Sequence, residues 1–239
     1  MAGLRRGLED PRGHLFMDVL RFIKIGNPKA FLLENVKGLV GHDEGQTFKF
    51  MLDSLQEQGE YDLHWRVLNS MTHANIPQNR ERVFIVGIRK DQKNSSGFLF
   101  PKEIPLGKQI KDILQPDSEV PERFFYDGRF KSYSDIRAGV TETNVVYQWR
   151  RQYVRANKSG VCPTLTANMG GGGHNVPLVM TESGAIRKLT PRECARIQGF
   201  PDEFKLPELA DSHLYHQFGN SVTVPLIERI AKSMAAHLR

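Results

Sequence analysis

The chain has 239 residues, of which 39% are hydrophobic and two are cysteines, and lysine plus arginine exceed aspartate plus glutamate by 33 − 27 = 6. This length allows one large domain or two modest ones with a real core. The chain has no apolar run of membrane length, no apolar signal core and no cluster of zinc-ligand residues, which argues against a membrane protein, an exported disulfide-rich protein and a metal site. We therefore expect a cytoplasmic protein, and its basic charge permits a polyanionic partner without indicating one.

Periodicity in the first ninety residues predicts helices that alternate with strands. Apolar residues at helical spacing predict helices over 14–26 and 48–59. Short apolar or alternating runs predict strands over 30–34, 63–68 and 83–88. Such alternation favours a parallel sheet covered on both faces.

The pattern changes after the third strand. Residues 91–185 contain many Gly, Pro, Ser and Asn residues with only short apolar runs, so a smaller, loop-rich domain with little regular structure is expected. Thr190 and Glu193, three residues apart, form a capping box for a helix that begins at Pro191. Residues 222–238 form a last amphipathic helix.

Two segments place charged residues where chemistry is expected. Glu34 follows the apolar run 30–33, and ligands of open α/β sheets bind at the carboxyl ends of strands. A carboxylate that caps the next turn is the simpler explanation of this segment alone. In Gln78-Asn-Arg80-Glu-Arg82, both arginines precede a strand and point to the same face. A salt bridge at the sheet edge would explain an isolated Arg-Glu-Arg equally well.

Together with 187–201 and 217–222, these segments follow the order found in DNA (cytosine-5)-methyltransferases of the bacterial restriction-modification type, which the chain resembles over nearly its whole length. The resemblance implies an α/β fold with an incomplete Rossmann-like S-adenosylmethionine-dependent methyltransferase domain and a small, loop-rich target-recognition domain. It implies a partial catalytic domain over 1–92, a target-recognition domain over 93–186, and a support helix and C-terminal helix over 187–239.

The resemblance implies methyl transfer from S-adenosylmethionine to C5 of a cytosine flipped out of a specific site in double-stranded DNA. In the family, a Cys thiolate adds to C6, and an acid must bond N3 so that the ring can accept charge. Glu34 matches this acid, and a buried carboxyl with a raised pKa would hold the proton near neutral pH. Arg82 matches the arginine that binds O2 and steers Glu34. Arg80 is expected to support the site by local pairing, or to contact DNA.

Further residues are assigned by the same resemblance. Arg12, in the glycine-rich start, matches an arginine of the mobile catalytic loop, and a frayed basic N-terminus is the alternative. Asn220, Ser221 and Val222 are expected to open the last helix and line the S-adenosylmethionine pocket, with a simple N-cap turn as the alternative. Arginines beside aromatics and a glycine run suit contacts to phosphates and base edges, although the arginines could equally form a solvated face. The predicted DNA contacts are Arg80, Arg150, Arg151, Arg155, Thr164, Thr166, Asn168, Gly170 and Gly171.

The family's first strand, its glycine-rich cofactor loop and its Pro-Cys nucleophile do not occur in this sequence. Cys162 precedes a proline and Cys194 falls within the predicted helix, so neither is expected to be the nucleophile. We expect a partial S-adenosylmethionine site, an exposed sheet edge, and inactivity without a complementary N-terminal methyltransferase subunit or segment. A split enzyme, a truncated product and a permuted relative would each explain this. The alternatives in function are a catalytically dead DNA-binding module and a non-catalytic subunit of a split methyltransferase.

Overall fold

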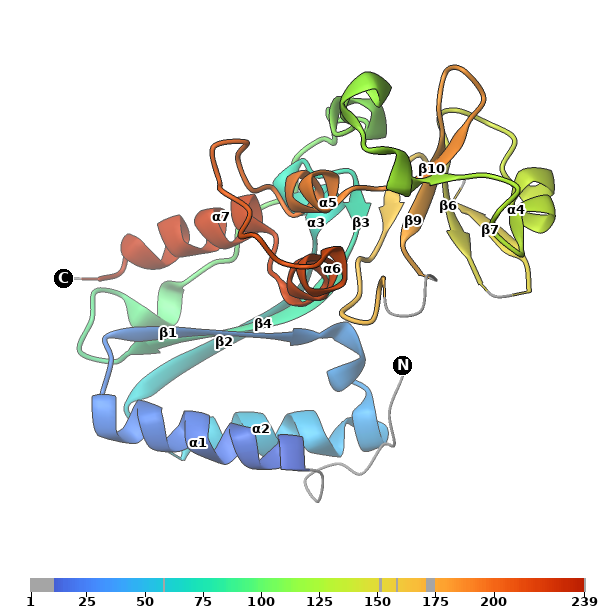
Figure 1. Cartoon of the computed structure of the whole chain (residues 1–239). Coiled ribbons are helices and arrows are strands. Elements are labelled where there is room, and N and C mark those ends of the chain that lie inside the picture. The colour runs from blue at the N-terminus through green and yellow to red at the C-terminus, as the bar shows by residue number, and fades with distance from the viewer. Residues whose placement is uncertain (1–10, 58, 151, 158, 171–174, 239) are drawn as a thin grey trace. The chain divides into compact units, whose positions relative to one another are not determined.

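The chain folds into two compact units that alternate along the sequence. The computed structural model describes residues 11–57, 59–150, 152–157, 159–170 and 175–238 (Figure 1). The units differ in range from the three predicted segments, because the chain leaves unit 1 after Leu68 and re-enters it at Glu81 and again at Glu228. Unit 1 comprises Met1–Leu68, Glu81–Lys102 and Glu228–Arg239, and unit 2 comprises Asn69–Arg80 and Glu103–Ile227.

Unit 1 contains a three-stranded sheet in the order β1-β4-β2. β1 and β4 run antiparallel, with Ala30 opposite Ile88. The prediction of a parallel sheet is therefore wrong. The apolar run of β4 predicts a buried strand, but nothing in that run sets the direction of the strand. The bounds are β1 (Ala30–Val36), β2 (Tyr61–Asn69) and β4 (Glu81–Arg89).

Helices α1 and α2 cover one face of this sheet, and α7 runs along the other face in its unit 1 portion (Figure 1). α1 buries Phe16 and Leu20 and α2 buries Phe48, in one core with Val83 and Ile85 of β4. The three predicted strands and these helices are confirmed, with ends shifted by a few residues. The bounds are α1 (Pro11–Gly26), α2 (Gln46–Gln56) and α7 (Val224–Ala235), with 3-10 turns at Lys37–Leu39, His42–Gly45 and Ser95–Gly97.

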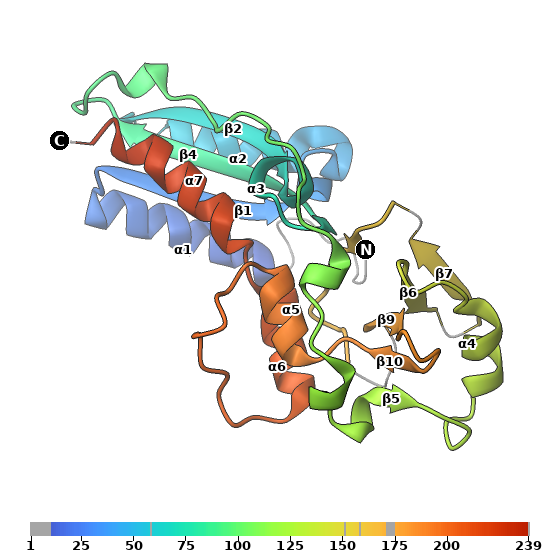
Figure 2. The ribbon, with the colours of Figure 1, turned by 90° about the horizontal axis from the view of Figure 1, so that it is seen from above.

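Unit 2 contains a five-stranded sheet in the order β5-β10-β9-β6-β7, and the pairs described in it are antiparallel (Figure 2). The short strands fit the expected loop-rich domain, but the sheet that they form was not predicted. Its strands are only two to four residues long, too short for a periodic pattern to show. The bounds are β5 (Phe125–Tyr126), β6 (Val146–Trp149), β7 (Val154–Asn157), β9 (Pro177–Met180) and β10 (Ile186–Lys188).

A separate two-stranded ribbon and four helices complete unit 2. In the ribbon, Gln78 pairs in parallel with Cys162. The predicted capping box of α5 is confirmed: Glu193 N donates to Thr190 Oγ1 and Thr190 N donates to Glu193 Oε2. The bounds are β3 (Gln78–Asn79), β8 (Cys162–Pro163), α3 (Ser70–Ala74), α4 (Tyr133–Gly139), α5 (Pro191–Ile197) and α6 (Asp211–Asn220), with 3-10 turns at Ile110–Asp112, Asp117–Glu119 and Glu122–Phe124.

Two classes of feature are absent from the described part of the chain. No helix there is both long and apolar enough to cross a bilayer. Within the same residues, no group of three or more His, Cys, Asp and Glu side chains could hold a metal ion.

Candidate active site and nucleic-acid interface

Glu34 and Arg82 face each other across neighbouring strands of unit 1. Because Glu34 stands opposite Phe84 and Val36 stands opposite Arg82, Glu34 and Arg82 are diagonal neighbours on one sheet face. Arg82 Nε lies 3.0 Å from Glu34 Oε1, and Arg82 Nη1 donates to the carbonyl of Glu81 at 2.8 Å. The sheet register therefore brings together the two side chains that the sequence assigns to the reacting base.

The surroundings of this pair differ from expectation in two ways. β1 continues to Val36, so Glu34 lies within the strand and not at its end. The Glu34 side chain is 26% exposed and that of Arg82 is 14% exposed, so the expected buried carboxyl is instead a solvent-accessible one. Burial lowers the pKa of Arg82, and the charge of Glu34 opposes that shift. The pair is held by the sheet yet open to a ligand.

Arg80 lies inside unit 2 and not on a surface that DNA could reach. Its side chain is only 2% exposed. Its guanidinium donates to the carbonyls of Leu165 at 3.0 Å and Ser221 at 2.5 Å, and more weakly to that of Gly219 at 3.5 Å. Of the two roles expected for Arg80, the structure therefore favours local support by hydrogen bonding over a contact with DNA. Because β3 ends before Arg80 and β4 begins after it, Arg80 does not share a strand face with Arg82 as predicted.

Two buried glutamines join the same segments of unit 2. Gln78 Oε1 accepts from the backbone N of Leu165 at 3.0 Å, and Gln78 Nε2 donates to the carbonyl of Ile197 at 3.1 Å. Gln198 Nε2 donates to the carbonyl of Phe218 at 2.7 Å. Sequence reasoning missed Gln198, whose only signal is its place in the segment 187–201. These bonds hold the loop after β8 against α5 and α6.

Gly219 is required where that loop crosses α6. A Cβ built on Gly219 would lie 2.2 Å from the carbonyl carbon and oxygen of Thr166, which are backbone atoms that cannot move aside easily. We expect Gly219→Ala to destabilise unit 2 by about 1–3 kcal/mol through this overpacking, as measured by urea unfolding. Gly128→Ala is the matched control, since a Cβ there meets no atom within 4 Å. Equal midpoints for the two variants would contradict the packing argument.

Most of the predicted DNA contacts that are described lie on the surface of unit 2. Arg150, Arg155, Thr166 and Asn168 are exposed, while Thr164 and Gly170 are half-buried. These residues belong to the β6–β7 hairpin and to the loop after β8. The four exposed side chains are polar and accessible, as a nucleic-acid surface requires.

Local contacts position these side chains. Arg150 Nη1 donates to Asn175 Oδ1 at 3.4 Å, and Thr166 Oγ1 donates to Asn168 Oδ1 at 2.8 Å. Gly170 has φ +82° and its Cα lies against Tyr215 of α6, so a side chain there would be both strained and crowded. Arg151 and Gly171 lie outside the described residues.

The predicted cofactor residues Asn220, Ser221 and Val222 lie at the end of α6 and in the link to α7, and not at the start of α7. Asn220 is the last residue of α6, Ser221 is its C-cap, and α7 begins at Val224. The argument from helix N-terminal amides therefore does not apply to Asn220, Ser221 and Val222. Asn220 is exposed, with its amide 3.5 Å from the ring of His216. α6 was not predicted, because its closing Gly-Asn resembles a turn.

Arg12 lies in the first turn of α1, which begins at Pro11. The expected catalytic loop therefore does not extend to Arg12, because residues 11–13 are helical. The side chain of Arg12, and the glycines Gly3 and Gly7, lie outside the described part of the structure.

Both cysteines are buried in the core of unit 2. Burial raises the pKa of Cys162 and of Cys194, so little thiolate is available for attack. We expect neither thiol to react with Ellman's reagent in the native protein, and both to react after denaturation in guanidinium. One fast equivalent in the native protein would contradict the conclusion that neither cysteine is a nucleophile.

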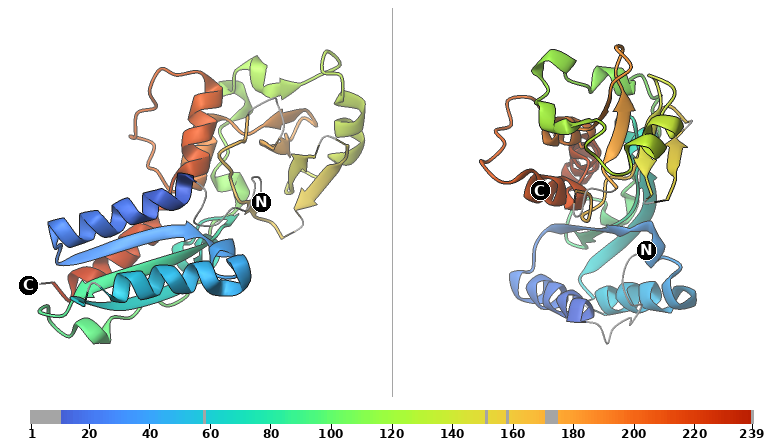
Figure 3. Two further views of the ribbon diagram at one scale, coloured as in Figure 1. Left: turned by 90° about the horizontal axis from the view of Figure 1, so that it is seen from below. Right: turned by 45° about the vertical axis from the view of Figure 1, so that its right-hand side comes forward.

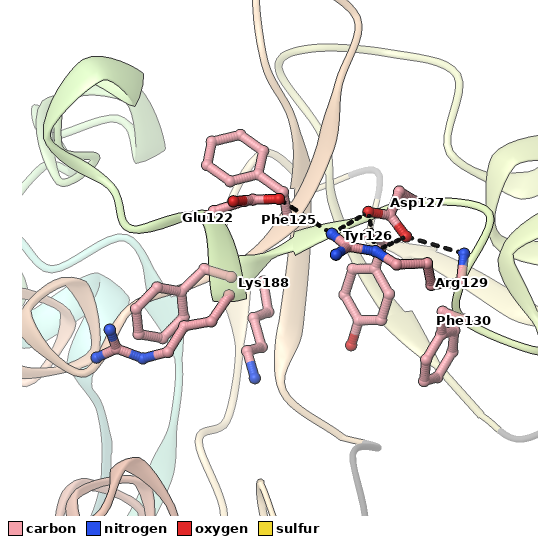
Figure 4. A pocket seen from close by; sticks show the side chains of 9 residues that line it. Glu122, Phe125, Tyr126, Asp127, Arg129, Phe130 and Lys188 are labelled. Atoms are coloured by element: carbon pink, nitrogen blue, oxygen red, sulfur yellow. Dashed lines mark hydrogen bonds and ion pairs between the residues drawn. The ribbon is translucent and has the colours of Figure 1, made fainter.

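A surface pocket of about 520 Å³ in unit 2 contains none of the predicted site residues (Figure 4). Arg129 pairs there with Asp127 and with Glu122, the latter at 3.0 Å. Lys188 Nζ lies 5.4 Å from the ring centre of Phe124, and burial lowers the pKa of this lysine. The pocket offers no group for methyl transfer.

The chain matches known proteins over nearly its whole length. A family model of the C-5 cytosine-specific DNA methylases matches residues 1–236. The type II methyltransferase M.Bsp6I of Bacillus sp. (strain RFL6) is 52% identical over 98% of this chain and 74% of its own length. M.HhaI of Haemophilus parahaemolyticus is 36% identical over 100% of this chain and 72% of its own length. The chain spans 61% of M.SsoII of Shigella sonnei, which is 34% identical.

Solved structures show the same fold at low sequence identity. The methyltransferase EhMeth of Entamoeba histolytica is 18% identical, with a TM-score of 0.69 over 97% of this chain and 71% of that one. The Dnmt2 methyltransferase of S. pombe is 16% identical, with a TM-score of 0.67 over 96% of this chain and 75% of that one. This chain therefore belongs to the C-5 cytosine-specific DNA methylases, an α/β family of S-adenosylmethionine-dependent transferases.

Proposed function

We propose that this chain carries the base-activating and target-recognition parts of a DNA (cytosine-5)-methyltransferase that acts on a flipped cytosine in a specific duplex site. The observation that supports this most strongly is the Glu34–Arg82 pair, 3.0 Å apart on an accessible sheet face of a member of this family. Pure DNA binding would not need a carboxylate and a guanidinium held together in this way.

The two side chains act on different edges of the base. The carboxyl group of Glu34 gives its proton to N3 as charge builds on the ring, and Arg82 donates to O2 from the guanidinium nitrogens that do not hold Glu34. Stabilising this charge favours addition of a thiolate to C6, which makes C5 nucleophilic. After C5 has gained the methyl group, a water molecule takes the C5 proton and the C6–S bond breaks. This restores the aromatic ring and the thiolate, and N3 returns its proton to Glu34.

The thiolate comes from a polypeptide segment other than the 239 residues of this sequence. Both cysteines of the chain are buried in unit 2 and have raised pKa values. We therefore infer that the chain alone is inactive and that a segment with the Pro-Cys pair completes it.

The chain supplies part of the site for S-adenosylmethionine, which provides the methyl group. The exposed amide of Asn220 and the half-buried hydroxyl of Ser221 fit the polar amino-acid end of this molecule, and Val222 provides an apolar contact beside them. The rest of that site belongs to the completing segment.

DNA recognition is assigned to unit 2. Arg150 and Arg155 suit phosphate or base-edge contacts, and Thr166 and Asn168 offer further hydrogen bonds. If the arginines bind phosphates, duplex affinity will fall steeply with salt, and each arginine removed will reduce the slope by about one.

Complementation tests the proposal. Methyl transfer from labelled S-adenosylmethionine to mixed-sequence duplex DNA would be measured for the chain alone, for a separately expressed segment from the part of M.Bsp6I that this chain does not cover, which is expected to supply the cofactor loop and the Pro-Cys pair, and for their mixture. A covalent fusion of the two removes any dependence on association. We expect activity in the fusion, and none in either part alone.

Each other outcome has a definite meaning. A folded, inactive fusion that binds duplex DNA would establish a DNA-binding module instead. A folded fusion that neither methylates nor binds DNA would leave a non-catalytic subunit. Methyl transfer by the chain alone would refute the need for an external nucleophile.

A further inference from the structure

The surface pocket of about 520 Å³ in unit 2 has aromatic walls and three basic side chains (Figure 4). Two of these have carboxylate partners, since Arg129 pairs with Asp127, and Arg123 Nε lies 2.9 Å from Asp211 Oδ2. The ammonium of Lys188 faces aromatic rings instead and forms no ion pair with any described residue. Within the described part of the chain, the pocket therefore carries one positive charge that no carboxylate balances.

The rings around Lys188 leave its charge poorly solvated. Lys188 Nζ lies 5.4 Å from the ring centre of Phe124 and 6.0 Å from that of Tyr215, and burial lowers the pKa of this lysine. Burial also raises the pKa of Tyr126, so its hydroxyl keeps a proton to donate. The Lys188 ammonium and the Tyr126 hydroxyl point the same way in Figure 4. An anion placed there would replace the water that the ammonium has lost.

The pocket adjoins the loop after β8, which contains predicted DNA contacts. A Cβ built on Gly170 of that loop would lie 2.6 Å from Cδ2 of Tyr215, whose ring also faces Lys188. β5 and β7 form opposite edges of the five-stranded sheet (Figure 3). Four strand spacings of about 4.8 Å separate these edges, a distance that about six nucleotides of one DNA strand cover. A duplex on the β6–β7 hairpin can therefore extend to the pocket.

We propose that Lys188 binds one phosphodiester of duplex DNA in this pocket, against the rings of Phe124 and Tyr126, and so extends the DNA contacts of unit 2 from the β6–β7 hairpin to β10. The inference rests on the proposed function, which assigns DNA recognition to unit 2. A phosphodiester carries one negative charge, which matches the one unbalanced charge of the described pocket. Inorganic phosphate and mononucleotides carry about 1.5 to 2 charges and match it less well.

The salt dependence of duplex binding tests the contact. The affinity of the full chain for labelled mixed-sequence duplex would be measured by anisotropy between 50 and 200 mM salt, the range over which phosphate contacts change affinity by roughly 10³–10⁵ in total. We expect Lys188→Met to reduce the slope of log affinity against log salt by about one, and the affinity at about 0.1 M salt by about fivefold. Lys188→Arg should retain the slope.

Lys111→Met is the matched control, because Lys111 is an exposed lysine on the turn Ile110–Asp112 of the same unit. It removes the same charge and should keep the slope, with affinity within about twofold. Acetylation by acetic anhydride, followed by peptide mass spectrometry, then examines the unaltered chain. Duplex DNA should suppress acetylation of Lys188 but not of Lys111, while inorganic phosphate and thymidine monophosphate at matched ionic strength should suppress neither.

The outcomes separate this inference from the proposed function. An unchanged slope in Lys188→Met, with or without weaker binding, overturns the phosphate contact. If Arg150→Met and Arg155→Met reduce the slope while Lys188→Met does not, unit 2 still recognises DNA and only the contact at Lys188 fails. Suppression of Lys188 acetylation by inorganic phosphate or thymidine monophosphate would assign the pocket to a free anion and refute the inference. A folded chain that binds no duplex would overturn both.

Discussion

Glu34→Gln in the completed enzyme is expected to lower methyl transfer by about 10²–10⁴-fold, the range for loss of a positioned acid or base. Glutamine keeps the size of the side chain and its place on β1, but it cannot exchange a proton with N3 or form an ion pair with Arg82. Transfer of labelled methyl groups to duplex DNA measures the effect, and duplex binding, measured by anisotropy, should remain unchanged.

The neighbouring ion pair provides a matched control. Lys37 Nζ, in the turn after β1, lies 2.8 Å from Glu81 Oε1 of β4, and Glu81 has no assigned role in the reaction. Glu81→Gln should retain activity within about twofold. Arg82→Ala should be as impaired as Glu34→Gln, because it removes both the O2 donor and the partner of the carboxylate. Full activity in Glu34→Gln or in Arg82→Ala would refute the assigned roles.

Arg187→Met is expected to destabilise unit 2 by about 3–5 kcal/mol, because it leaves the buried Glu193 without its counter-charge. Arg187 and Glu193 are 1% and 0% exposed, and their side chains form two bonds of 2.9 Å. Arg187 Nε also lies 2.9 Å from Asp117 Oδ1. Urea unfolding followed by the fluorescence of Trp149, in a Trp65→Phe background, reports on unit 2.

Two further variants show whether the effect comes from burial of the pair. Arg187→Met/Glu193→Leu removes both charges and should recover part of the lost stability. Arg129→Met breaks an ion pair in the same unit whose arginine is 76% exposed, and it should leave the unfolding midpoint unchanged. An Arg187→Met protein as stable as the unaltered chain would contradict a structural role for the pair.

The elements with long apolar patterns could be predicted from the sequence. The helix ending at Gly26, the strand over 83–88 and the capping box at Thr190 all have local signals that burial or hydrogen bonding makes necessary. The direction of β4 has no such signal, because a strand buried on both faces has the same composition whether it runs parallel or antiparallel. Short strands such as β5 and β10 depend on their neighbours more than on their own residues.

The contact between Glu34 and Arg82 could be predicted from the sequence, because each residue belongs to a motif with an assigned partner. Glu34 and Arg82 were assigned to the same reacting base, and the β1–β4 register places them 3.0 Å apart. Arg80 is only two residues from Arg82 but belongs to unit 2, because β3 ends at Asn79 and β4 begins at Glu81. The sequence contains no local mark of that break. The contacts of Gln198 also depend on segments distant in the sequence.

Glu34 and Arg82 are proposed to activate cytosine for attack from C5. Release of tritium from duplex DNA tritiated at C5 of cytosine measures this activation, because C5 loses its hydrogen only after a nucleophile has added to C6. We predict that the fusion of this chain with the M.Bsp6I segment releases tritium, and that the Glu34→Gln fusion, with equal duplex affinity, releases it at least about 100-fold more slowly. Release at equal rates would show that Glu34 does not activate the base.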